Sequence, residues 1–99
     1  MEKIQVQFRI FKGEVIAVFP YQIESNTDVL SYSHIGQHSG CIWNINQFSK
    51  PAKPEQYEPL KKELESIGYN LEIIKKRNHQ KYVDAYYKSV GFEEPFHII

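Results

Sequence analysis

The 99 residues of this chain suffice for one small domain with a single hydrophobic core, and they exclude a large active-site cleft. Twelve Lys and Arg balance twelve Asp and Glu, so the chain lacks the positive excess that is typical of nucleic-acid-binding domains. The single cysteine excludes an internal disulfide, and 41% hydrophobic residues are typical of a folded protein rather than a disordered one.

The N-terminus alternates polar and apolar residues, whereas a signal peptide needs an unbroken apolar segment. No run approaches the roughly 18 apolar residues of a transmembrane helix. We therefore expect a cytoplasmic protein without a membrane partner. The sequence also shows no diagnostic catalytic motif, and we expect no cofactor.

Strand patterns fill the first half of the chain, residues 1–48. Residues 4–10 alternate apolar and polar side chains, which predicts a strand with one buried face and one solvent-exposed face. The exposed face should hold three polar side chains: Gln5, Gln7 and Arg9. Lys12-Gly13-Glu14 predicts a turn, and a second, central strand should cover Val15 to Phe19 and end at Pro20.

After a polar loop over residues 22–28, a third strand is expected from Val29, with Leu30, Tyr32 and His34 sharing its apolar face. Gly36 and Gly40 predict a turn that contains Gln37 and His38. Residues 41–46 should form a fourth strand whose buried face holds Trp43.

A main helix is predicted over residues 54–67, because Pro54 suits the first helical position and Gly68 suits the C-terminal end. Its buried stripe should hold four side chains spaced by three or four residues: Tyr57, Leu60, Leu64 and Ile67. A fifth strand is expected over residues 69–76. This strand could run parallel to a neighbour, so a mixed sheet is the alternative to a mostly antiparallel one.

A second helix is predicted over residues 79–90, with Asn78 as its N-cap and Val83, Tyr86 or Tyr87, and Val90 as its apolar stripe. The apolar tail, residues 91–99, should dock on its own domain or on a neighbouring subunit, so a homodimer is one alternative. The fold class expected is a single α+β domain. It has a four- or five-stranded, mostly antiparallel sheet, one main helix and a second C-terminal helix.

The stretch from Ser31 to Cys41, S-Y-S-H-I-G-Q-H-S-G-C, combines histidines, serines, glycines and the only cysteine. At a turn, these side chains would offer hydrogen-bond donors, acceptors and aromatic faces to a protein partner. The candidate binding residues are Tyr32, His34, Gln37, His38 and Trp43.

Two kinds of chemistry are alternatives for this stretch. His34, His38 and Cys41 could ligate zinc if a fourth ligand came from elsewhere, although the paired spacing of structural zinc sites is missing. A serine activated by a neighbouring histidine could act as a nucleophile, but no nucleophile elbow positions it. A histidine-based or zinc-dependent enzyme therefore remains an alternative to a binding surface.

A basic and aromatic patch in the second half of the chain predicts a different partner. Cationic side chains there could follow a phosphate backbone while aromatic rings stack on bases, as in single-strand-binding proteins. The candidate nucleic-acid-binding residues are Lys75, Lys76, Arg77, Lys81 and Tyr82. The other interpretation is a solvated strand end followed by a helix whose tyrosines cover the sheet.

Three segments, F-R-I-F-K-G-E-V-I-A-V-F-P at 8–20, S-Y-S-H-I-G-Q-H at 31–38 and residues 51–69, resemble a group of small uncharacterised bacterial proteins. That group occurs in phage-like and mobile-element contexts and shares a S-Y-x-H-x-G-Q-H block. The resemblance implies a bacterial or mobile-element origin and no particular activity, and the tail beyond Arg77 lies outside it. The leading hypothesis is a non-catalytic accessory or protein-interaction protein that uses the turn from Tyr32 to Gly40.

Overall fold

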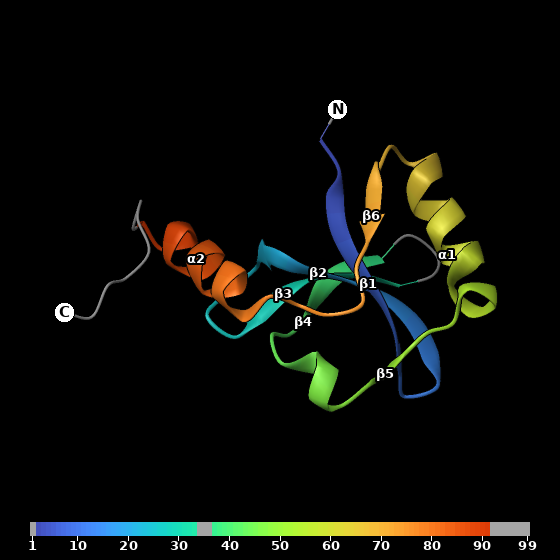
Figure 1. Cartoon of the computed structure of the whole chain (residues 1–99), viewed down its shortest axis with the longest axis horizontal. Coiled ribbons are helices and arrows are strands. Elements are labelled where there is room, and N and C mark those ends of the chain that lie inside the picture. Colours follow the sequence, from blue (N-terminus) through green and yellow to red (C-terminus); the bar gives the residue numbers. More distant parts are fainter. Residues whose placement is uncertain (1, 34–36, 92–99) are drawn as a thin grey trace.

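A mixed sheet forms the centre of the protein (Figure 1). This computed structural model describes residues 2–33 and 37–91. The strands are β1 (Ile4–Phe11), β2 (Glu14–Ile23), β3 (Asp28–Ser33), β4 (Gln37–Ile42), β5 (Lys50–Pro51) and β6 (Leu71–Ile73). The helices are α1 (Pro54–Ser66), α2 (His79–Ser89) and the short 3-10 helix η1 (Ile45–Gln47). The predicted α+β class is confirmed, with six strands instead of four or five.

The β1–β2 hairpin turns at Lys12 and Gly13, as predicted. Both residues have positive φ, 51° and 79°, and Phe11 pairs directly with Glu14. Two consecutive positive-φ residues are the signature of the tight turn that matches the twist of paired strands, and glycine adopts that conformation without strain.

The predicted end of the second strand at Pro20 is wrong, because β2 continues to Ile23. The pairing of β2 with β3 shifts register between Phe19 and Ile23. Proline has no N–H to donate to a strand ladder and is therefore found at such irregularities. The shift lets Pro20 stay inside the sheet, where its side chain is fully buried.

The predicted turn around His38 is also wrong, because Gln37 to Ile42 form β4 along the whole of β3. Gly40 lies opposite Leu30, and a Cβ at this position would approach Asp28 Oδ2 to 2.9 Å. The glycine thus makes room for a neighbouring side chain instead of forming a turn. The strand predicted over residues 41–46 ends at Ile42, after which the chain enters η1.

Two short strands share the outer edge of β1. The Ile4 N–H donates to Asn70 O at 2.8 Å and the Ile74 N–H donates to Val6 O at 2.9 Å, which pairs β6 parallel to β1. The Ala52 N–H donates to Phe8 O at 2.9 Å beside β5. The backbone groups of Ile4, Val6 and Phe8 point to the same edge of β1, because they belong to alternate residues of the strand. Strands β5 and β6 therefore lie end to end along that edge. The mixed sheet is confirmed, and β6 is shorter than the predicted strand 69–76.

The two helices cover opposite faces of the sheet and lie toward its opposite ends (Figure 1). Beneath α1, the cluster of buried side chains contains Val6, Phe8, Ala17, Phe19, Tyr32, Leu60 and Leu64. Beneath α2 and η1, a second cluster contains Val18, Val29, Ile45 and Tyr82. Since adjacent residues of a strand point to opposite faces, Phe19 and Val18 of β2 belong to different clusters.

The face of β1 predicted to be exposed is covered instead. Gln7 is 2% exposed and Arg9 is 8% exposed. The Gln7 amide donates to Lys75 O at 3.0 Å and accepts from Asn46 Nδ2 at 3.3 Å. Segments far along the chain therefore seal this face, and their contacts are absent from any local pattern.

The boundaries of both helices agree with the predictions to within a residue. Helix α1 begins at Pro54 and ends before Gly68, whose φ is 109°. In α2 the Asn78 side chain accepts from the Lys81 N–H at 3.0 Å, the predicted N-cap. Neither described helix has the length and apolarity that a bilayer span requires. Residues 92–99 of the predicted tail lie outside the described residues.

The predicted apolar stripes of both helices need correction at their C-terminal ends. Ile67 is 54% exposed and Val90 is 47% exposed. In α2 the buried anchor is Tyr82, which the sequence pattern assigned to an exposed patch. The helices end near these positions, so the sheet no longer covers the last predicted member of either stripe.

The contrast between Leu64 and Ile67 gives a test of this packing. The Leu64→Ala variant should lower the free energy of unfolding by about 2–5 kcal/mol, because it removes a fully buried side chain from beneath α1. The Ile67→Ala variant should change it by less than about 0.5 kcal/mol. Urea unfolding followed by circular dichroism measures both, and equal losses would contradict this packing.

Candidate functional site

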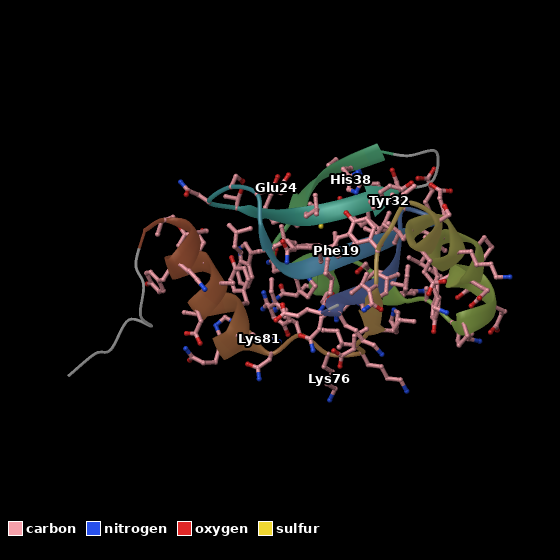
Figure 2. The ribbon with its side chains drawn as sticks, turned by 90° about the horizontal axis from the view of Figure 1, so that it is seen from above. Phe19, Glu24, Tyr32, His38, Lys76 and Lys81 are labelled. Atoms are coloured by element: carbon pink, nitrogen blue, oxygen red, sulfur yellow. The ribbon has the colours of Figure 1, made fainter. Side chains whose placement is uncertain are left out.

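His38 joins the edge strand β4 to the far end of α1. It pairs with Tyr32 across the β3–β4 ladder, and the two rings meet edge to face with centroids 4.7 Å apart. His38 Nε2 lies 2.8 Å from the Tyr69 hydroxyl. The Tyr32 hydroxyl in turn donates to the carboxylate of Glu63 on α1. Figure 2 shows Tyr32 and His38 together on this side of the sheet.

The five candidate binding residues do not form one surface. Tyr32 is 1% exposed and belongs to the core, so it supports His38 without meeting a partner itself. His34 lies outside the described residues, and Gln37 begins β4. Of the candidate residues whose side chains the structure describes on this face, His38 is the exposed one. The described part of the predicted turn surface after residue 36 is an edge strand instead.

Trp43 is separated from that group by the sheet. It packs against the α2-side cluster, where its ring stacks on Tyr82 with centroids 5.5 Å apart. Tyr32 belongs to the opposite cluster beneath α1. The prediction that Trp43 lies on a fourth strand beside His38 is therefore wrong, because the chain leaves the sheet after Ile42.

Cys41 and His38 cannot ligate one metal ion together in this fold. The two residues lie three positions apart on β4, so their side chains point to opposite faces. Cys41 packs against the α2-side cluster, whereas His38 contacts Tyr32 and Tyr69 on the α1 side. In the part of the chain that the structure describes, no three His, Cys, Asp or Glu side chains are grouped as a metal site would require.

Burial also makes Cys41 a weak nucleophile. Desolvation raises the pKa of its thiol to about 11, although the hydrogen bond with Ser31 lowers the pKa. The thiolate, and not the thiol, is the reactive form. Cys41 is therefore a partly buried, protonated thiol at neutral pH.

The predicted basic and aromatic patch is divided by the packing of α2. The Lys81 ammonium donates to Gln5 Oε1 at 2.7 Å and lies 4.8 Å from the Tyr21 ring centroid. Tyr82 is only 9% exposed. The Arg77 guanidinium lies over Trp43 and Tyr82, 5.0 and 4.7 Å from the two ring centroids. These rings therefore do not form an open platform on which bases could stack.

Lys75, Lys76 and Arg77 instead border a concavity of about 700 Å³. The same concavity is lined by Arg9 of β1, which the sequence pattern placed on an exposed strand face. The alternation of apolar and polar residues along β1 predicts which face of the sheet the Arg9 side chain lies on. It does not predict which segment covers that face. The segment that covers Arg9 lies some forty residues away in sequence, and this separation explains why sequence reasoning missed it.

The buried guanidinium of Arg9 has only neutral partners among the described residues. Its Nε donates to Ser49 Oγ at 2.9 Å, and its Nη2 donates to the carbonyl oxygens of Ser49 and Asn46 at 2.7 and 3.1 Å. Desolvation lowers the pKa of Arg9 from its usual value. An arginine nevertheless remains protonated in proteins, so the lining of this concavity includes a fixed positive charge.

No family model, no curated protein and no solved structure matches this chain in the three comparisons. The resemblance to small bacterial proteins of mobile elements therefore stays a prediction. The two surfaces of the described chain with distinct chemistry are the β4 edge and the basic concavity.

The chemistry of Cys41 can be tested directly, because it is the only cysteine. At about pH 8, iodoacetamide should alkylate the native protein at least about tenfold more slowly than the urea-unfolded chain, since the folded thiol stays protonated. The native rate should then rise with pH toward a midpoint near 11. A native midpoint near that of a free thiol would contradict the burial of Cys41.

Proposed function

We propose that this protein is a non-catalytic docking protein that binds an extended segment of a partner protein along β4. The observation that carries the proposal is the outer edge of β4, whose backbone groups have no strand beside them in the part of the chain that the structure describes. Strand β4 is the last in the order β4-β3-β2-β1-β5. Addition of a strand to such an edge is a common mode of peptide recognition.

The direction of the β4 backbone follows from one hydrogen bond beyond its end. The Trp43 N–H donates to Thr27 O at 2.9 Å, toward β3. Backbone groups alternate in direction along a strand, so the odd-numbered residues of β4 face β3 and the even-numbered ones face outward. The outward groups belong to His38, Gly40 and Ile42, and none has a backbone partner in the described chain.

Within the described residues, this edge lacks the features with which proteins usually block strand addition. Natural edge strands are protected by lysine, proline, a bulge or a covering element. The sequence of β4, Q-H-S-G-C-I, contains neither lysine nor proline, and it pairs with β3 in continuous register. Ile42 is also 42% exposed. The edge therefore offers both unpaired backbone groups and apolar surface to a partner.

A hollow beside His38 would provide side-chain selectivity. It has a volume of about 390 Å³, and its lining includes Ile67, Tyr69 and Ile4. In strand addition, the backbone gives affinity and pockets for alternate side chains give specificity. The hollow fits an apolar side chain of the bound segment on the α1 face of the sheet.

Docking is favoured over a histidine-based reaction by the surroundings of His38. Its Nε2 is engaged by the Tyr69 hydroxyl, and its ring rests on the buried ring of Tyr32. These contacts fix the orientation of the imidazole at the edge, as a recognition residue requires. An accessory role in a bacterial or mobile-element system is consistent with this proposal.

Peptides selected from a random phage-displayed library against the native protein should bind as an extended strand. With a selected synthetic peptide, the backbone amide resonances of His38, Gly40 and Ile42 should shift most. The Ile42→Lys variant should weaken binding by about tenfold or more, because it removes apolar contact and places a charge at the edge. Isothermal titration measures the affinity.

Phe48→Lys is the matched control, since Phe48 is 60% exposed but lies beside the Lys12-Gly13 turn. Its affinity should stay within about twofold of the native value, because exposed sites away from a contact contribute little. Equal losses in both variants, or selection of no peptide, would overturn the proposal. So would a native dimer that becomes monomeric in Ile42→Lys on sedimentation, because a second copy would then occupy the edge.

A further inference from the structure

We propose that the concavity between β5 and β6 binds a small ligand that carries one or more phosphate groups. This site is independent of the docking surface. Figure 2 places Lys76 and Lys81 on the side of the molecule away from His38. The strand order agrees, because β4 forms one edge of the sheet, and β5 and β6 share the other.

The shape of the site results from the gap between the two short strands. On the outer edge of β1, β6 pairs with Ile4 to Val6 and β5 pairs with Arg9 and Ile10, so no described strand pairs with residues 7–8 on this edge. Two adjoining hollows meet at this gap, a wide one of about 700 Å³ and a narrow one of about 170 Å³. The wide hollow is within the usual size range of small-molecule sites.

The charge of the site is positive and not balanced locally. Arg9, Lys75, Lys76 and Arg77 line the wide hollow, and among the residues that the structure describes no carboxylate lines either hollow. The chain as a whole carries a formal net charge of zero, whereas these four cationic side chains gather at one concavity. A concave surface lined by one sign of charge raises the local concentration of oppositely charged ligands.

The two arginines are held in position before any ligand binds. Hydrogen bonds to Ser49 and Asn46 fix Arg9 through Nε and Nη2, and Nη1 has no partner among the described residues. The Arg77 Nη1 donates to Trp43 O at 3.3 Å while its guanidinium lies over two rings. Guanidinium groups match the oxygen geometry of phosphate, and fixed side chains lose less entropy on binding.

A compact ligand fits these observations better than a nucleic-acid strand. The rings nearest the basic side chains, Trp43 and Tyr82, stack on each other and are covered by Arg77. Single-strand binding relies on free aromatic faces in addition to cations. The narrow hollow, lined by Phe8, Pro51 and Tyr57, instead suits a small apolar group attached to the phosphate.

Inorganic pyrophosphate is the probe for this site. In titration calorimetry at low ionic strength, the Lys75→Glu/Lys76→Glu variant should bind pyrophosphate about tenfold or more weakly than the native protein, because two attractive charges become repulsive. Both lysines are exposed, so the fold should tolerate the change. The matched control, Lys61→Glu/Lys62→Glu on α1, makes the same charge change away from the concavity and should retain the affinity within about twofold.

Arg9→Lys provides a second arm that keeps the charge but loses the fixed guanidinium geometry. Its pyrophosphate affinity should fall while its circular dichroism spectrum and urea midpoint confirm that it is folded. Equal weakening by the two double-lysine variants would show only a general charge effect and would overturn the site. Absence of pyrophosphate binding, with tight and salt-sensitive binding of a short single-stranded oligonucleotide, would replace it with a nucleic-acid surface.

Discussion

The guanidinium of Arg9 ties the segment after β4 to the centre of the sheet. Its donors bond to Ser49 and Asn46, which lie on either side of the end of η1. Burial of a charged group is costly unless its donors are satisfied, and hydrogen bonds to charged groups contribute about 1.5–3 kcal/mol each. This interaction therefore makes the path of residues 46–49 specific, which places β5 on the edge of β1.

The hydrogen bonds of Arg9 also explain which segments cover the polar face of β1 and how the basic concavity is shaped. With β5 held at one end of β1 and β6 at the other, residues 7–8 between them have no ladder partner on this edge among the described residues. Gln7, next to Arg9 in space on the same face, bonds to Lys75 O and Asn46 Nδ2. The polar face of β1 thus organises the segments on both sides of the gap, and the cations of residues 75–77 are carried to its rim.

The two candidate surfaces lie at opposite edges of one sheet because the chain winds outward from β1 in both directions. Strands β2, β3 and β4 follow one another as antiparallel neighbours on one side. The later segments return to the other side of β1. The β4 edge has no second strand beside it in the described chain, while the basic edge is bordered by the segments around β5 and β6. One offers unpaired backbone, and the other offers a hollow with fixed charge.

The amino-acid sequence by itself determined the elements whose signals are local. Turn glycines, helix caps and periodic apolar side chains predicted the β1–β2 hairpin, α1, α2 and the approximate position of β6. These signals depend on backbone conformation and on neighbours within a few residues, so they can be read without the fold. The mixed character of the sheet was left open between two alternatives.

Only the tertiary structure decided which faces are covered and which residues meet. Gly40 indicated a turn, but the space it provides is used by Asp28 across the ladder. Tyr32 and Tyr82 were expected at binding surfaces, yet α1 packs on Tyr32, and α2 places its own Tyr82 against the other face of the sheet. Arg9 joined the basic site because a segment forty residues away covers it. Such contacts depend on distant parts of the chain, and a local pattern carries no information about them.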